Sequence, residues 1–268
     1  MKNKFLKTIG CLAAALALTA CNDDETADGN RLPEGKYPVT FIATGLQMPA
    51  ATRTTADGTW GLTAAVVAVK IGYEVKRYVA DMTGTASTTL KPAEGIIPFY
   101  WQSTADIKVS AWYLGTGEYK SALPTHWSVQ TNQNNYDNGY QKSDFLYAPE
   151  ADIDFKGTKP LTFYHQTAKV VVNIRNQGVV NNDDENIKSV TINAVTDGTF
   201  QADAGGNYRL SAKTGTGVTS TDIIFKKLSS QNTDVVFKDG EKGEPALASY
   251  QALVIPQTLN ANTLSKYR

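Results

Sequence analysis

Short runs of alternating apolar and polar residues, separated by turn residues, recur along most of this 268-residue chain. In residues 37–43 every second side chain is apolar, and in an extended strand these side chains share one face. Thr, Val and Tyr, which favour strands, are abundant, and no stretch of about 12 residues combines a 3.6-residue apolar period with helix caps. The sequence therefore predicts an all-β protein.

Further strands are expected at residues 65–71, 74–79, 87–90, 107–113, 169–174, 187–194, 208–210, 222–225, 235–237 and 249–255. Many short strands at this spacing indicate β-sandwiches or barrels. The strand at 107–113 is expected to bury one face and to leave the other, which carries Trp112, partly exposed. The Asn- and Gln-rich residues 131–142 are expected to form an exposed loop.

The N-terminal segment has the form of a secretory signal. Residues 1–7 are basic, and the apolar stretch at 9–18 is too short to span a bilayer, so residues 1–20 are predicted to be removed. The final Leu-Thr-Ala precedes Cys21 and resembles the lipobox of bacterial lipoproteins. That resemblance implies that Cys21 carries lipid, palmitate included, and becomes the first mature residue. The alternative is an ordinary secreted protein in which Cys21 is incidental.

The residues after Cys21 are acidic and polar. Residues 21–35 cannot bury enough apolar surface to fold by themselves, so they are predicted to form a flexible tether. The run from Asn22 to Glu25 also resembles the export signal that sends lipoproteins of some anaerobic Gram-negative bacteria to the outer face of the outer membrane. Either interpretation agrees with a surface lipoprotein of the cell outer membrane.

Charge and length exclude several classes of protein. The precursor has 26 basic (Lys+Arg) and 26 acidic residues, and loss of the three signal lysines leaves a net charge of −3. No basic patch interleaved with aromatic residues suggests a nucleic-acid partner. No second apolar segment approaches the roughly 20 residues of a membrane helix, so the lipid is the expected membrane attachment. The roughly 250 mature residues are enough for two domains.

Residues for catalysis or metal binding are scarce. His126 and His165 are the only histidines, and His165 is expected to be structural. No nucleophile elbow, phosphate loop or zinc motif occurs, so neither an enzyme nor a cofactor is expected. The acidic run at residues 181–186 lacks the spacing of a calcium loop, and a plain turn is favoured there. Asp152 and Asp154 share a strand face and are expected to form a wet edge rather than an acid/base pair.

Three aromatic side chains are candidate platforms for sugars. Trp112, Tyr136 and Tyr140 are candidates for exposed stacking surfaces, although scattered surface aromatics are ordinary in soluble domains. A glycan-binding role for them is therefore a minor alternative.

Several motifs in fixed order resemble one family, the fimbrillins, which are lipoprotein precursors of type V pilus subunits. The motifs are the lipobox at Cys21, the early strand at 39–43, Thr-Arg-Thr-Thr-Ala-Asp-Gly-Thr-Trp at 52–60, Phe-Tyr-Trp at 99–101, Trp-Tyr at 112–113, Ser-Asp-Phe-Leu-Tyr-Ala at 143–148, the run at 161–174, and Leu-Val-Ile-Pro-Gln at 253–257. No single motif is specific, but their order and spacing cover most of the chain.

The resemblance implies two tandem transthyretin-like β-sandwich domains. Gly157 and Pro160 favour a boundary near residues 154–159, which gives domains at 36–158 and 159–268. The resemblance also implies maturation by an arginine-specific protease after an Arg in the loop that follows the first strand. Arg53 is at that position, so Thr54 would begin the mature subunit. The cut would release the lipid with the displaced strand, which carries Val39, Phe41 and Ala43.

In the family's scheme, the groove left by the displaced strand accepts a donor strand from another pilus subunit. The implied function is a structural or adhesive subunit of a cell-surface fimbrium, with a host or bacterial surface ligand as a further partner. The family pattern continues beyond the Pro-Gln motif, whereas this chain stops at Arg268. The second domain is therefore expected to be incomplete: either the sequence is truncated, or the subunit accepts a donor strand without supplying one.

Two alternatives stay open. The first strand could be a permanent edge strand, with Arg53 an ordinary solvated loop residue. The protein could also remain anchored by its lipid and bind glycan or a host protein.

Overall fold

The computed structural model describes residues 31–32, 34–44, 60, 65–81, 86–157, 159–174, 187–229 and 247–259. These residues form sixteen strands and one short helix, which confirms the all-β prediction. The strands are β1 (Phe41–Thr44), β2 (Val66–Ile71), β3 (Glu74–Ala80), β4 (Thr88–Pro92), β5 (Ile107–Leu114), β6 (His126–Ser128), β7 (Phe145–Ile153), β8 (Leu161–Thr162), β9 (Tyr164–His165), β10 (Ala168–Ile174), β11 (Thr191–Ala194), β12 (Asp197–Ala202), β13 (Tyr208–Ala212), β14 (Thr221–Ile224), β15 (Lys226–Lys227) and β16 (Ala248–Val254); the helix α1 is Gly139–Lys142. The strand expected at 235–237 lies outside the described residues.

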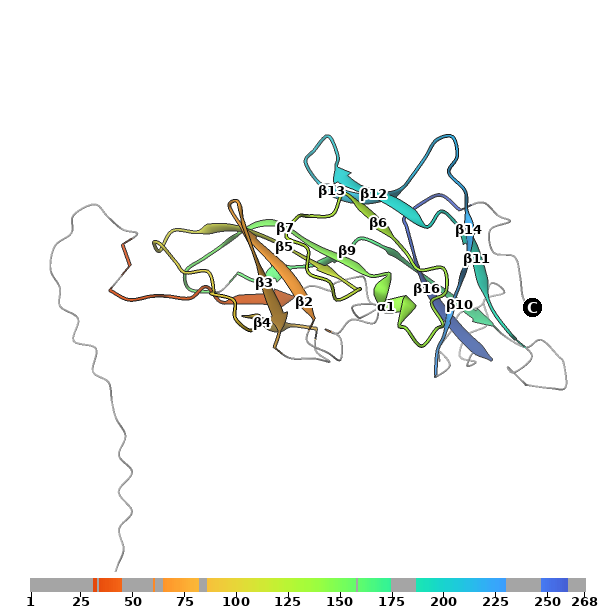
Figure 1. Ribbon diagram of the computed structural model, residues 1–268, viewed down its shortest axis with the longest axis horizontal. Coiled ribbons are helices and arrows are strands. Elements are labelled where there is room, and N and C mark those ends of the chain that lie inside the picture. Colours follow the sequence, from red (N-terminus) through yellow and green to blue (C-terminus); the bar gives the residue numbers. More distant parts are fainter. Residues whose placement is uncertain are drawn as a thin grey trace, which may run out of the picture.

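The N-terminal half is built on one curved sheet of eight strands in the order β8-β1-β4-β3-β2-β5-β7-β9 (Figure 1). Neighbouring strands are antiparallel except for β1 and β8, which are parallel. The concave side encloses a core rich in aromatic rings, among them Trp60, Tyr78 and Phe163, all fully buried. This first core holds the N-terminal half together.

A second core lies in the C-terminal half, where three small sheets meet (Figure 1). Their strand orders are β10-β16-β15, β11-β14 and β13-β12-β6. Every residue of β16 is buried, and Phe200, Ile223 and Phe225 fill the space between the sheets. The second core therefore lies between three sheets of short strands, and β16 is buried within it along its whole length.

Strand β5 contributes to both cores. Its residues Val109, Ala111 and Tyr113 point into the first core, whereas Trp112 and Leu114 point into the second. The face that carries Trp112 is exposed at Lys108, as expected, but not at Trp112 itself, because the C-terminal half packs on it and leaves it 2% exposed. In β7, too, successive side chains point alternately into the first and the second core. Strands β5 and β7 therefore form a wall that both cores share.

Some strands on either side of residues 157–160 belong to a sheet in the other half of the chain. Strands β8 and β9 follow that segment, yet they join the sheet of the N-terminal half. Strand β6 precedes it, yet pairs with β12 in the C-terminal half. These pairings tie the two halves of the chain together.

The Asn- and Gln-rich residues 131–142 match the exposed loop that their composition predicted only in part: residues 131, 132 and 134–138 are exposed, whereas Gln133 and the start of α1 are buried. The side chain of Gln133 is buried, and its amide donates to the carbonyl oxygen of Leu253 at 2.7 Å. The Gln133 amide oxygen also accepts from the backbone N–H of Leu253 at 2.8 Å. Tyr140, in α1, is fully buried as well. The amide of Gln133 thus makes the hydrogen bonds to Leu253 that a neighbouring strand would otherwise make. A polar segment can therefore lie against β16 without leaving its backbone groups unpaired.

The Gln133→Met variant is expected to lower the free energy of unfolding by about 1–3 kcal/mol, because it leaves the buried N–H and C=O of Leu253 without partners. Thermal or urea unfolding would measure the loss. The matched control is Gln130→Ala, whose side chain is exposed and which should change stability by less than about 0.5 kcal/mol. Equal stability of the two variants would contradict this role for Gln133.

Candidate functional site

Strand β1 lies inside the eight-stranded sheet, with a neighbour on each side. Ala43 has Cα partners in both neighbours, Thr88 of β4 and Leu161 of β8. Beyond the end of β8, the N–H of Phe163 donates to the carbonyl oxygen of Thr44 at 2.9 Å. The alternative of an edge strand is therefore wrong for β1.

The residues just before β1 pair with a different part of the chain. The N–H of Val39 donates to the carbonyl oxygen of Phe99 at 2.8 Å, and the N–H of Trp101 donates to that of Tyr37 at 2.9 Å. Residues 37–44 thus run along two partners in succession, first 99–101 and then β4. Both partners come later in the sequence than Arg53.

The inward side chains of this segment are buried as their alternation predicted. Val39, Phe41 and Ala43 belong to the first core, and Phe41 is 1% exposed. Ile42, which points the other way, is 37% exposed. Full burial of Val39 and Phe41 contributes about 1.5–3 kcal/mol for each side chain. Most of the attachment of this strand therefore comes from one face.

The Phe41 side chain occupies a pocket made by aromatic rings. Its centroid is 5.2 Å from that of Tyr78 and 6.4 Å from that of Phe99, with both rings edge-on to it. Tyr78 and Phe99 lie parallel at 6.2 Å, and the N–H of Phe99 donates to the Tyr78 hydroxyl at 3.1 Å. Burial raises the pKa of Tyr78, so its hydroxyl stays protonated at neutral pH.

A cation supports the outer side of this pocket. The Nζ of Lys76 lies 4.5 Å from the Phe99 ring centroid and donates to the carbonyl oxygen of Pro98 at 3.2 Å. These contacts among Lys76, Tyr78 and Phe99 do not involve β1. The walls of the pocket are thus held by interactions of their own.

Trp60 anchors the chain downstream of the first strand. It is fully buried, and its ring meets those of Phe163 at 5.2 Å and Tyr113 at 6.0 Å, both nearly perpendicular. In the sequence, Arg53 stands between the end of β1 at Thr44 and this anchor. Sequence reasoning gave Trp60 no role of its own, although a Trp that directly follows a polar stretch of sequence is a signal that could have identified it.

Three predicted site residues lie outside the described part of the chain: Cys21, Arg53 and Thr54. The acidic run at 181–186, where a plain turn is expected, lies outside it as well. Among the described residues, no three His, Cys, Asp or Glu side chains are grouped so as to hold a metal ion. None of the described helices is long and apolar enough to cross a membrane.

The remaining polar candidates take part in pairs. His165 Nδ1 lies 2.8 Å from Asp144 Oδ1, and both side chains are buried. Asp152 accepts from the Lys108 ammonium at 3.2 Å on an exposed surface. His165 thus joins β9 to the segment that follows α1.

The proposed sugar platforms do not lie on one surface. Trp112 and Tyr140 are buried, so the expectation that they are exposed is wrong. The Trp112 indole N–H donates to the carbonyl oxygen of Lys120 at 3.0 Å, and Tyr140 packs against Leu253. Of the three, Tyr136 is fully exposed.

Comparison with known proteins gives two findings. A crystal structure of a candidate cell adhesion protein from Bacteroides uniformis is similar to this chain, with a TM-score of 0.50 and 18% sequence identity. The match covers 84% of this chain and 76% of that one, and it supports the all-β sandwich fold. None of the curated proteins matches the sequence significantly. The sequence model of the fimbrillin-like family matches residues 52–266. This chain therefore belongs to the fimbrillin-like family.

Proposed function

We propose that this protein is a subunit of a cell-surface pilus, exported as an outer-membrane lipoprotein through Cys21 and matured by cleavage after Arg53. Membership of the fimbrillin-like family supports the pilus role, and the similarity to a candidate cell adhesion protein agrees with it. The further steps of the proposal rest on the way strand β1 is inserted in its sheet.

The observation that carries the proposal is that the described segments pairing with residues 37–44, which are 99–101, β4 and β8, all come after Arg53 in the sequence. A cut after Arg53, between Thr44 and Trp60 in the sequence, would leave β1 attached by non-covalent contacts alone. Since β1 lies between β4 and β8, its departure would open a groove inside the sheet rather than shorten an edge. The groove would expose apolar pockets and the unpaired backbone groups of two strands.

A strand from a neighbouring subunit would fill such a groove by β-augmentation. The pockets define what it must present: a large side chain at the position of Phe41, where Tyr78 and Phe99 form the walls, and a small one at the position of Ala43. Main-chain hydrogen bonds would supply affinity, and these two positions would supply specificity.

The uncut strand would also prevent early assembly. As part of the same chain, β1 competes with any donor strand at a high effective concentration, about millimolar or above for a short linker. Cleavage removes this advantage. Because Cys21 precedes Arg53, the lipid would leave with the displaced strand, so the anchor is temporary.

The test is the intact mass of protein collected from the cell surface. We expect a species that begins at Thr54, with the lipidated residues 21–53 absent from it. The precursor in the inner-membrane fraction, which has not met the arginine-specific protease, serves as the control and should retain both lipid and first strand. Surface material consisting solely of lipidated full-length protein would contradict the cleavage and favour a permanently anchored binder.

A further inference from the structure

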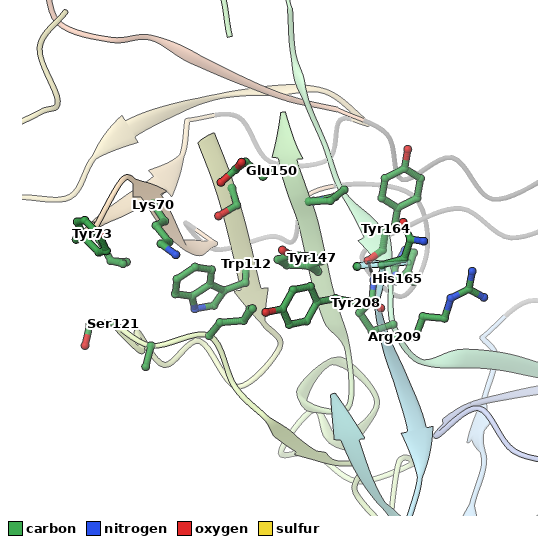
Figure 2. A pocket seen from close by; sticks show the side chains of 18 residues that line it. Lys70, Tyr73, Trp112, Ser121, Tyr147, Glu150, Tyr164, His165, Tyr208 and Arg209 are labelled. Atoms are coloured by element: carbon green, nitrogen blue, oxygen red, sulfur yellow. Dashed lines mark hydrogen bonds between the residues drawn. The ribbon is translucent and has the colours of Figure 1, made fainter. Parts of the chain in front are cut away.

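A cleft of about 1130 Å³ lies between the outer face of the N-terminal sheet and the turn of the β12–β13 hairpin (Figure 2). Trp112 and Tyr147 line it from β5 and β7, and Tyr208 lines it from β13. Tyr73 and Tyr164 also line it, and both side chains are exposed. The cleft is distinct from the groove of β1, which faces the first core on the other side of the sheet.

Tyr208 offers an aromatic ring in a defined orientation. Its centroid is 5.3 Å from the buried Phe200 ring and 5.5 Å from the Tyr147 ring, and these contacts hold it against the second core. The side chain nevertheless remains 41% exposed. Figure 2 shows Tyr208 and Tyr147 close together in the middle of the cleft. The two rings thus form a preorganised surface for stacking.

Tyr147 brings a hydroxyl to the lining of the cleft. The residue is 7% exposed, and its hydroxyl makes no hydrogen bond to any group in the described part of the chain. Burial, together with Tyr208 and Glu150, raises the pKa of Tyr147 to about 12, so the hydroxyl is protonated at neutral pH. A protonated phenol hydroxyl that lines the cleft is free to donate a hydrogen bond to a ligand or to accept one from it.

The polar side chains around these rings include both donors and acceptors. Glu150 supplies a carboxylate, Lys70 and Arg209 supply cations, and Asn207 supplies both an amide donor and an acceptor. The Nε of Arg209 lies 3.3 Å from an Asp203 carboxylate oxygen, which orients the guanidinium at the turn. Mixed charge of this kind suits a ligand with many hydroxyl groups better than a polyanion.

We propose that this cleft binds an oligosaccharide. The C–H face of a sugar ring would stack on Tyr208, and its hydroxyls would bond to Tyr147, Glu150 and Asn207. An extended peptide would bind by adding a strand to a sheet edge at the cleft, and it fits less well. On the edge of β13 that faces away from β12, the N–H of Ala212 already donates to the carbonyl oxygen of Pro256 at 3.2 Å. Strand β9, the other edge at the cleft, has only two residues. This site goes beyond the pilus-subunit role and does not depend on cleavage at Arg53.

The experiment applies the full-length chain, purified in detergent, to an array of neutral and acidic oligosaccharides and to an array of extended peptides. We expect binding to a restricted set of oligosaccharides. The affinity for the best of them should fall by about tenfold or more in Tyr208→Ala and Tyr147→Phe, since each removes about one favourable interaction. The matched control is Tyr136→Ala, which removes a fully exposed tyrosine that does not line the cleft and should bind as the wild type does.

Tyr147→Phe keeps the ring and its packing, so it decides the question even where Tyr208→Ala weakens the fold. Absence of oligosaccharide binding would overturn the proposal. So would equal binding by wild type and Tyr147→Phe, or binding to peptides alone. Loss of binding in Tyr136→Ala to the same extent would place the sugar elsewhere and would overturn the proposal too.

Discussion

Replacement of Arg53 by alanine is expected to keep this chain out of SDS-resistant pilus polymers in the bacterium that produces it. A protease pocket built to pair with a guanidinium discriminates by about 10⁴-fold against a side chain that cannot make those bonds. The uncut β1 would then stay between β4 and β8 and block the groove. Immunoblots of surface material, heated moderately in SDS, should show the variant only as lipidated monomer.

Arg31 provides the matched control for this experiment. It lies before β1, so a cut there would free the lipid and leave the strand in its sheet. Arg31→Ala should therefore polymerise as the wild type does. Ladders of unchanged length in Arg53→Ala would show that assembly does not require cleavage at that position, and the donor-strand scheme would then fail for this subunit.

Truncation of Phe41 is expected to destabilise the precursor strongly and to leave the assembled subunit unchanged. The side chain is 1% exposed among aromatic rings, and Phe→Ala changes in cores cost about 3–5 kcal/mol in the free energy of unfolding. Urea unfolding of the precursor, followed by Trp fluorescence, would measure this loss. In polymers the displaced strand is absent, so material from Phe41→Ala should dissociate at the same SDS temperature as the wild type.

Two further variants distinguish the contribution of the displaced strand to stability from the contribution of its groove. Phe99 is buried in the wall of the pocket and stays with the subunit, so Phe99→Ala should weaken both the precursor and the polymer. Ile42 belongs to the same strand as Phe41 but is 37% exposed, so Ile42→Ala should cost less than about 1.5 kcal/mol in the precursor. Polymers as unstable with Phe41→Ala as with Phe99→Ala would mean that β1 is retained after assembly.

The first strand was predictable because its signal is local. Alternation in residues 37–43 indicated which side chains face inward, and Val39, Phe41 and Ala43 do so. Strand β7 gave no such signal, because residues 145–148 are buried on both faces and show no alternation. Strand β12 was missed for the opposite reason, since it contains few apolar residues and is held by pairing with β6 and β13.

Fold class, inward-facing residues and family were thus accessible from the sequence itself, since period, turn residues and motif order are properties of neighbouring positions. Tertiary structure alone decided that β1 has a strand on each side, because β8 comes from more than a hundred residues later in the chain. It also decided which aromatic rings are exposed: Trp112 is covered by the C-terminal half, whereas Tyr208 is left open at the cleft. Whether a side chain is buried depends on which distant segments of the chain pack against it. The pattern of neighbouring residues in the sequence does not contain that information.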